Sequence, residues 1–462
     1  MKLDPRPPME ALVGLQTCFD RIHAAGGRSI CVGGFVRDLV LGREPLDIDI
    51  EVQGMTYDHL VDLLSGFAQV DTRGARFGVA VCLGIEWALP RREHANGSGH
   101  RDFEVELVPD LPFKESVLRR DFTCNAIGME ARSGLLLDPL AGIDDLRRRR
   151  LHPIAAERWS EDPLRPLRAM QLLARLEFSA SDRLLHCTRG MSFASLSAER
   201  IGTEWDKLLL RAQRPSIGLQ FLHDSGTLPQ FPEIAALRQC PQDPSWHPEG
   251  DVWNHTMMVI DAASGLRSGN APADERLMYS ALCHDLGKPL TTVEMEDGRI
   301  RSPAHEPKGE DPTRSFLSRL AKTAPLQEAV VALVRNHLAP VQFITANMPA
   351  SPRAYRRLAR TLDAAGTTIE ELARLARADS LGRSTADALA RSFPAIDLFL
   401  EKAKEFDSAS APPTDVVFGR HLIARGLTPG PDFKRILSEC REIQDQEGLE
   451  DPELILDRVL SE

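Results

Sequence analysis

Residues 29–38 read SICVGGFVRD, and residues 46–50 read LDIDI. The first four residues predict a strand, and the pair Gly33 and Gly34 predicts a turn into a helix that begins near Phe35. Two glycines at such a turn let backbone N–H groups approach phosphate oxygens at the positive end of a helix. This stretch therefore predicts an α/β or α+β domain that cradles a phosphate group.

The second stretch places acidic and apolar residues in alternation. Asp47 and Asp49 alternate with Leu46, Ile48 and Ile50, so a strand here points both carboxylates to one face. Two like charges on one face repel each other unless they bind cations, and paired Mg²⁺ ions would activate a ribose hydroxyl and neutralise a leaving pyrophosphate. The alternative is an exposed acidic edge strand, but the nearby glycine turn favours phosphate transfer.

The rest of the chain changes character at about residue 150. Short β-rich runs mix with helical segments before this point, whereas after about residue 155 apolar residues recur three and four apart, which is typical of amphipathic helices. Stretches rich in Pro, Gly and Ser mark further boundaries near residues 240 and 408. We therefore expect an α/β (α+β) domain with a mixed sheet, followed by all-α regions. The expected regions are 1–152, 153–240, 241–408 and 409–462.

Composition and charge restrict the class of protein. The 462 residues are 42% hydrophobic and carry a formal net charge of −11, which argues against indiscriminate coating of nucleic acid but permits a local basic groove. No stretch approaches the roughly 20 apolar residues of a membrane span, and the first residues lack the order of a signal peptide. The eight cysteines form no C-x-x-C pair. We expect reduced thiols in a cytoplasmic protein that does not associate with a membrane.

Four motifs in a fixed order carry a family resemblance. GGFVRD (33–38), LDID (46–49), LRRDFTCNAIG (118–128) and EDPLRPLRA (161–169) resemble the class II tRNA nucleotidyltransferases and the related bacterial poly(A) polymerases. The resemblance extends over about residues 28–210. It implies a nucleotidyltransferase head followed by a helical neck that recognises the base of the incoming nucleotide.

The resemblance also implies roles for individual residues. Asp47 and Asp49 would hold Mg²⁺ as catalytic residues, with CTP and ATP as substrates. The planar fork of arginine suits phosphate, although Arg119 and Arg120 could also form an ordinary solvated face. The residues implied to bind the nucleotide are Gly33, Gly34, Arg37, Asp38, Arg91, Arg119, Arg120, Asp121, Asn125, Asp162, Arg165 and Arg168.

Residues 86–107 resemble a strand and a flexible loop that position the growing RNA end in the same family. Glu86 stands where a third catalytic carboxylate is expected, although many glutamates on exposed strands have no such role. Arg91 and Glu93 are expected to begin the loop. The residues expected to make it pliable are Gly97, Ser98 and Gly99.

The pair Asp162 and Arg165 suggests how a base is selected. On a helix these residues lie one turn apart on the same face, so they can read one base edge together. Cytosine and adenine each present an amino donor beside an unprotonated ring nitrogen, which suits an Asp acceptor beside an Arg donor and disfavours G and U. In the resembled family such a pair replaces the template. The alternative, compatible with the first, is a capped helix start at Pro163 with Arg165 in a salt bridge.

A second set of residues follows the order H…HD…H…H…D within helical surroundings. The run CHDLGK (283–288) resembles the HD phosphohydrolase superfamily. Imidazoles and carboxylates suit divalent transition metals, which activate a water molecule toward a phosphoester, whereas a lone histidine on a helix is usually a core residue. Lys288 could contact a substrate phosphate, and His247 is a weaker candidate. The expected metal ligands are His255, His284, Asp285, His305, His337 and Asp379.

Together these resemblances imply an enzyme that adds C, C and A to the 3′ end of tRNA without a nucleic-acid template. The HD region would add phosphatase and 2′,3′-cyclic phosphodiesterase activity for 3′-end repair, and residues 409–462 would contact tRNA. Relatives that add only A, only CC or poly(A) share the head motifs, so they remain alternatives. A further alternative is an HD phosphohydrolase that uses its head to bind RNA. The oligomeric state is left open.

Overall fold

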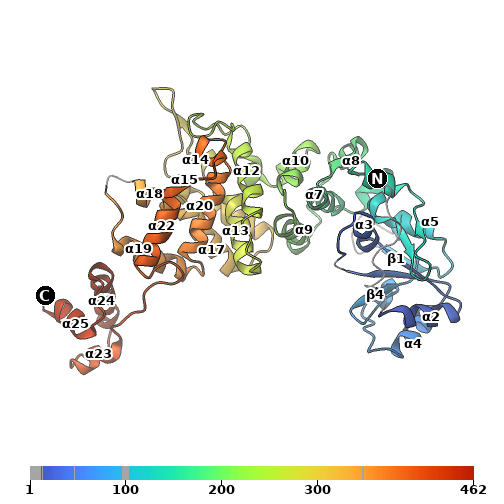
Figure 1. Cartoon of the computed structure of the whole chain (residues 1–462), viewed down its shortest axis with the longest axis horizontal. Coiled ribbons are helices and arrows are strands. Elements are labelled where there is room, and N and C mark those ends of the chain that lie inside the picture. Colours follow the sequence, from blue (N-terminus) through green and yellow to red (C-terminus); the bar gives the residue numbers. More distant parts are fainter. Residues whose placement is uncertain (1–11, 13, 46, 96–102, 346–347, 462) are drawn as a thin grey trace. The chain divides into compact units, whose positions relative to one another are not determined.

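The computed structural model describes residues 12, 14–45, 47–95, 103–345 and 348–461. The chain forms two compact units (Figure 1). Unit 1 comprises Met1–Ser197 and Ile217–Gln230, and unit 2 comprises Ala198–Ser216 and Phe231–Glu462. The predicted mixed-sheet domain followed by helical regions is confirmed, whereas the four region boundaries stay a prediction.

Unit 1 is built on a six-stranded mixed sheet with the strand order β3-β4-β2-β1-β7-β8. The pair β2 and β4 is parallel, and the other neighbouring pairs are antiparallel. An apolar cluster against β1 contains Ile30, Val32, Phe113, Val117 and Ala126. The strands are β1 (Arg28–Val32), β2 (Asp49–Gln53), β3 (Val79–Cys82), β4 (Ile85–Ala88), β7 (Gly128–Glu130) and β8 (Leu136–Leu137).

Strand β2 begins at Asp49, three residues after Leu46, where the alternation of acidic and apolar residues starts. Asp49 is the partner of Val32, and Val32 is the last residue of β1 because Gly33, with φ 72°, turns the chain away. Asp47 therefore lies in the segment before the strand rather than on it. The predicted strand at 29–32 and the helix that follows it, α3 (Gly34–Val40), are both present.

The remaining elements of unit 1 are short. Strands β5 (Arg91–Ala95) and β6 (Phe103–Leu107) form an antiparallel hairpin, and β9 (Arg150–Leu151) pairs with β10 (Ser179–Ala180) in parallel. The helices include α2 (Gln16–Ala24), α4 (Tyr57–Ser65), α5 (Phe113–Ser116), α6 (Gly142–Arg147), α7 (Arg165–Leu176) and α8 (Asp182–Thr188).

Unit 2 is helical apart from a small hairpin of β11 (Val293–Glu294) and β12 (Ile300–Arg301). Helix α12 (Val252–Ser264) packs on both α13 (Ala271–Cys283) and α20 (Ile369–Leu381), as Figure 1 shows. The longer helices that complete this unit are α9 (Ala198–Arg211), α16 (Glu310–Arg319), α17 (Ala324–Asn336), α18 (Ala339–Thr345), α19 (Pro352–Ala364), α22 (Pro394–Glu405), α24 (Asp432–Glu447) and α25 (Pro452–Leu460).

Apolar packing in unit 2 includes an aromatic group and a separate core formed by the last helices. The fully buried Trp205 of α9 packs edge-on against Phe231 and Phe316, with ring centroids 5.0 and 5.1 Å away. The last three helices, which include α23 (Gly419–Ala424), share a separate core. Within the described ranges no helix is both long and apolar enough to cross a membrane. All eight cysteines lie in described segments and carry free thiols.

Candidate functional site

The turn between β1 and α3 brings three predicted residues together. Gly33 has φ 72° and ψ −137°, a conformation that is essentially restricted to glycine. A Cβ atom at this position would lie 3.2 Å from both Asp49 Oδ2 and Arg120 Nη1. The turn, the strand carboxylate and the arginine therefore converge, and a side chain at residue 33 would intrude between them.

The predicted carboxylates gather at the same end of the sheet. Asp49 of β2 lies directly opposite Glu86 of β4 in the parallel register, and Glu86 is exposed. Burial raises the pKa of Asp49, Arg120 opposes this rise, and the charge of Asp47 adds to it. Crowded carboxylates of this kind are suited to bind divalent cations, whose charge relieves the repulsion. The residues present therefore fit the predicted metal site.

A chain of hydrogen bonds joins the predicted nucleotide-binding residues. Arg37 donates to Asp38 Oδ1 at 2.8 Å and to Asn125 Oδ1 at 2.8 Å. Asn125 in turn donates to Asp121 Oδ1 at 2.9 Å, and Arg168 donates to Asp121 Oδ2 at 2.7 Å. Burial by itself raises the pKa of Asp121, but the Arg168 guanidinium and the Asn125 amide hold it below its usual range. Asp121 is therefore an ionised anchor that fixes Asn125 and Arg168.

Glu51 is a buried acid that the sequence argument missed. It follows Asp49 by two residues on β2, and it is 1% exposed. Ser116 Oγ donates to Glu51 Oε1 at 2.9 Å, and Arg119 Nη2 lies 4.0 Å from Oε2. The D-x-D-x-E alternation was the signal that could have revealed it. Glu51 places Arg119 next to the strand that carries Asp49.

Arg120 has an unsatisfied donor that points to an anionic ligand. Burial lowers its pKa, although Glu51, Asp121 and Asp49 oppose this effect. Its Nε atom is buried and has no hydrogen-bond partner in the described part of the chain. A buried donor without a partner costs free energy, and a phosphate oxygen would satisfy it.

Arg91 and Glu93 do not begin a loop, as the resemblance implied, but lie on strand β5. The backbone pairing of β5 with β6 extends the sheet-like conformation to Ala95. Arg91 Nη1 donates to the Phe77 carbonyl at 2.9 Å, and its charge contributes to the lowered pKa of Arg120. The residues Gly97, Ser98 and Gly99 lie outside the described residues.

Asp162 and Arg165 are close in the chain but not on one helix, so this part of the expectation was wrong. Asp162 is extended, with φ −122° and ψ 101°, because a following proline disfavours the helical conformation. Its Oδ1 accepts from Leu164 N at 3.1 Å, and α7 begins at Arg165. Arg165 donates to the Arg158 carbonyl at 3.0 Å and lies over the ring of Trp159.

Replacement of Gly33 by alanine tests whether nucleotide transfer depends on the conformation of this turn. We expect Gly33→Ala to lower the rate of nucleotide transfer about 10- to 100-fold, because the glycine-only conformation costs about 1–3 kcal/mol and each 1.4 kcal/mol is tenfold in rate. The measurement is single-turnover addition of one nucleotide to RNA. Gly42→Ala is the matched control, since Gly42 also has positive φ but has no atom near its Cβ position. Equal rates for the two variants would contradict the importance of this turn.

Unit 2 brings all of the predicted HD residues into one buried cluster. His255 lies on α12 and Asp379 on α20, whereas the other residues lie at helix ends. These residues form two triads, and within each triad the ligand atoms lie within 4.8 Å of one another. The first triad contains His255, His284 and Asp379, and the second contains Asp285, His305 and His337.

The histidine rings of this cluster turn the same nitrogen inward. Nδ1 of His284, His305 and His337 donates to the carbonyl three residues earlier, at 2.7–2.9 Å. The Nε2 atoms of His305 and His337 then face each other at 3.3 Å. Burial lowers the pKa of His337 to about 3, so its Nε2 carries a lone pair. An inward-facing lone pair of this kind is available to a metal ion.

Asp285 connects the two triads. One or other of its oxygens lies 3.2 Å from His284 Nε2, 3.4 Å from His305 Nε2 and 3.9 Å from His255 Nε2. Burial raises the pKa of Asp285, but His284 and Lys288 hold it well below its usual range. Neither oxygen accepts a well-aligned hydrogen bond within the described residues. The donor set and this central carboxylate fit one or two transition metal ions.

The turn after Asp285 is shaped by a close approach of two segments. A Cβ atom at Gly287 would lie 2.0 Å from the His305 carbonyl oxygen and 2.6 Å from Gly309 N. A glycine is therefore required for α15 (His305–Lys308) to bring His305 against Asp285. Lys288, a candidate for contact with phosphate, is buried here, and its Nζ lies 2.8 Å from Asp285 Oδ2 and 2.7 Å from Gln242 Oε1.

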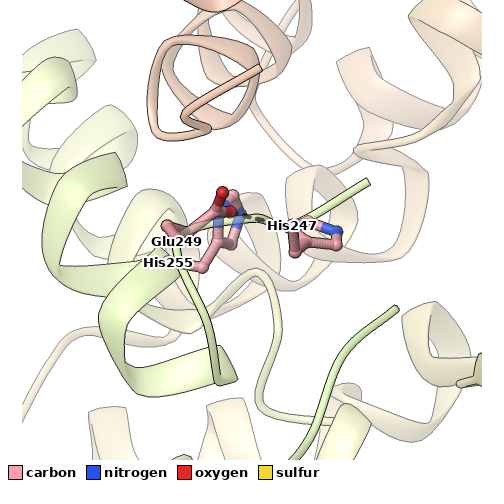
Figure 2. Close-up of side chains that lie close together, drawn as sticks. All are labelled: His247, Glu249 and His255. Carbon is pink, nitrogen blue, oxygen red and sulfur yellow. Dashed lines mark hydrogen bonds and ion pairs between the residues drawn. The ribbon is translucent and has the colours of Figure 1, made fainter. Parts of the chain in front are cut away.

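Two further charged residues border the cluster and were not predicted. Arg383 lies 3.3 Å from Asp379 Oδ2. Glu249 lies between His247 and His255, and its Oε1 accepts from both rings at 2.8 and 2.9 Å (Figure 2). Glu249 is two residues after the weaker candidate His247, in the run WHPEGD. Proximity to that histidine was the available signal.

Two family models match the chain at these two sites. The Poly A polymerase head domain matches residues 30–152, and the HD domain matches residues 252–381. Similar curated proteins include the multifunctional CCA protein of Stenotrophomonas maltophilia (strain K279a), 37% identical over 317 residues, which are 66% of this chain and 75% of that protein. The multifunctional CCA protein of Xylella fastidiosa (strain M23) is 37% identical over 324 residues, or 67% and 74% of the two chains.

Solved structures share the fold over nearly the whole chain. The Bacillus stearothermophilus CCA-adding enzyme in complex with CTP has a TM-score of 0.67 at 20% identity, covering 99% of this chain and 98% of that one. The Thermotoga maritima CCA-adding enzyme complexed with tRNA_CCA has a TM-score of 0.59 at 17% identity, with the same coverage.

Proposed function

Because the chain belongs to the family of the multifunctional CCA proteins, we propose that it adds C, C and A to the 3′ end of tRNA. It uses CTP and ATP and needs no nucleic-acid template. The observation that carries this proposal is the convergence of Gly33, Asp49, Glu86 and Arg120 at one end of a sheet, in a domain that matches the Poly A polymerase head domain. We place this activity in the cytoplasm, where tRNA and nucleoside triphosphates are available.

The chemistry that we propose is attack of the tRNA 3′-hydroxyl on the α-phosphate of the bound nucleotide. Asp47, Asp49 and Glu86 would hold Mg²⁺, which when bound supplies activation of the hydroxyl and neutralisation of the leaving pyrophosphate. Arg120 offers its unpaired buried donor to the triphosphate. Positioning of this kind supplies most of the catalysis in phosphoryl transfer.

The anchored residues keep this site in shape. Asp121 holds Asn125 and Arg168, and Asn125 holds Arg37, so the polar groups are oriented before the nucleotide arrives. Preorganised donors are worth more than mobile ones, because no free energy is spent on ordering them during the reaction.

Asp162 and Arg165 are proposed to select the base, although they flank a turn. We expect Asp162→Asn to lower the ratio of kcat/KM for CTP over UTP at least about tenfold, because the added amide donor pairs with the carbonyl of uracil. The variant keeps an oxygen that accepts from Leu164 N, so the turn is preserved. The assay is addition of one nucleotide to a tRNA transcript that lacks CCA. An unchanged ratio would remove Asp162 from base selection.

The HD site is proposed to hydrolyse terminal phosphates and 2′,3′-cyclic phosphates, so that damaged 3′ ends become substrates for addition. Its buried imidazoles and carboxylates would hold a divalent transition metal, which when bound supplies an activated water molecule. Asp285 and Asp379 remain ionised despite burial. They balance the charge of such an ion and orient the neighbouring histidines.

The C-terminal helices are proposed to contact tRNA, but not through all of their arginines. Arg425 is already paired with Glu453 and Asp457, and Arg435 is paired with Glu439 at 2.9 Å. An arginine held by internal ion pairs contributes less to phosphate binding, since those pairs must first break.

The proposed function is tested with tRNA transcripts that end before CCA, after C and after CC. Each is incubated with CTP, ATP or both, and the products are resolved to single nucleotides. Ordered addition that stops at CCA is the expected result. Addition of A alone to the CC-ended transcript, or unlimited addition of A, would assign the chain to a specialised relative. No addition at all would make the HD site its principal activity.

A further inference from the structure

His255 differs from the other histidines of the HD cluster in the hydrogen-bond partner of its Nδ1 atom. The other three donate Nδ1–H to a backbone carbonyl three residues earlier. His255 lies inside the first turns of α12, and its Nδ1 instead meets Glu249 Oε1 at 2.9 Å (Figure 2). A carboxylate from a separate loop therefore replaces the local carbonyl at this one ligand.

Glu249 is held in place on every side. Its side chain is 3% exposed, and Oε1 accepts from both His247 and His255. The other oxygen, Oε2, accepts from Ser384 N at 3.1 Å, in the turn after α20. These contacts fix Glu249 Oε1 as an acceptor that faces Nδ1 of His255.

This geometry sets which nitrogen of His255 faces the cluster. Since Nδ1 must donate to Glu249, Nε2 is the atom that points inward, 3.0 Å from Asp379 Oδ1 and 3.3 Å from His284 Nε2. A carboxylate behind a metal-bound histidine fixes its ring and raises its basicity. A backbone carbonyl, which is neutral, does this more weakly.

We infer that Glu249 is a positioning residue, which orients His255 and strengthens it as a ligand for the HD metal. This inference rests on the proposed metal-dependent activity of the HD site. Glu249 also links the loop before α12 to the turn after α20 through Ser384, so the helices that carry His255 and Asp379 are tied at one point. Loss of the carboxylate therefore weakens one of the two triads selectively.

The three side chains in Figure 2 do not form a metal site of their own, although their ligand atoms lie within 4.8 Å of one another. Both Nδ1 atoms point at the same oxygen, at 2.8 and 2.9 Å, and an ionised carboxylate can only accept. Protons on the two nitrogens satisfy this contact fully. Around Asp285, by contrast, three Nε2 atoms converge on one carboxylate whose oxygens have no well-aligned hydrogen bond among the described residues, and an ion fits there.

The test compares Ni²⁺ binding by the full chain and three variants, measured by equilibrium dialysis of metal-free protein. Glu249→Gln keeps an acceptor for His255 but loses the charge, so we expect affinity to fall about tenfold, and Glu249→Ala should lose about 100-fold. Ser384→Ala is the matched control, because it removes a 3.4 Å contact to the same carboxylate and leaves His255 untouched. It should bind Ni²⁺ with native affinity.

A second measurement separates positioning from a general structural role. In Glu249→Gln the Ni²⁺ concentration that gives half-maximal phosphate hydrolysis should rise, while the rate at saturating Ni²⁺ recovers and nucleotide addition stays unchanged. Native Ni²⁺ affinity in both Glu249 variants would overturn the inference. Equal weakening in Glu249→Gln and Ser384→Ala would overturn it too, since Glu249 would then only tether the loop. Absence of Ni²⁺ binding in the native chain would instead refute the proposed HD activity.

Discussion

Replacement of Asp49 by asparagine is expected to lower the rate of nucleotide addition at least about a thousand-fold, while phosphate hydrolysis stays at its native rate. The substituted amide keeps the volume of the side chain but removes the charge opposite Glu86 and beside Gly33. Loss of metal-based stabilisation costs several kcal/mol, and about 4 kcal/mol corresponds to a thousand-fold. The measurement is single-turnover addition of CMP to a tRNA transcript that lacks CCA.

The control for this experiment is Asp58→Asn, which removes an exposed carboxylate from α4 of the same unit. It should add nucleotides at the native rate. Addition by Asp49→Asn at more than about one hundredth of that rate would contradict the proposed metal site. Loss of both activities together would point to misfolding of the chain, and a circular dichroism melt would reveal it.

Asp285→Asn should have an effect of similar size on the hydrolysis that we propose for the HD site. It neutralises the carboxylate that stands between the two triads, within 3.2–3.9 Å of three Nε2 atoms. An amide in its place cannot balance a divalent ion, so hydrolysis of a 2′,3′-cyclic phosphate should fall about a thousand-fold. Addition of CCA to intact ends should not change.

The matched variant is Asp297→Asn, which alters an exposed acid in the turn between β11 and β12. The expected pair of results is hydrolysis at the native rate by Asp297→Asn and at about one thousandth of it by Asp285→Asn. The metal content of both proteins, measured by atomic absorption, gives a separate readout. Hydrolysis that survives in Asp285→Asn would place the activity outside the HD cluster.

The elements of the site that the sequence predicts are those whose chemistry depends on local spacing. Gly33 and Gly34 after an apolar run predict the turn, and the ordered HD residues predict a buried metal cluster. The glycine turn depends only on residues that are neighbours in the chain. The HD pattern combines residue types that rarely occur together by chance. The helical placement of Asp162 was wrong, because Pro163 disfavours the helical conformation of the residue before it.

The contacts that could not be predicted join residues far apart in the chain. The resemblance implied that Glu86 joins Asp49, but no local pattern fixes the parallel pairing of β4 with β2 that makes them partners. Glu249 meets the Ser384 backbone 135 positions later, and Asp121 meets Arg168 across 47 positions. Each contact follows from the packing of whole elements, which depends on the summed burial of many side chains.

The packing of Trp205 against Phe231 and Phe316 decides where the chain can be cut. A fragment that starts at residue 241, at the break in composition, would lack Trp205 and Phe231 and leave Phe316 facing water. Removal of a buried tryptophan alone lowers the free energy of unfolding by about 3–5 kcal/mol. This is a large part of the free energy of unfolding of a typical domain. A fragment that carries the HD domain and is intended to remain soluble should therefore begin no later than Ala198, the first residue of α9.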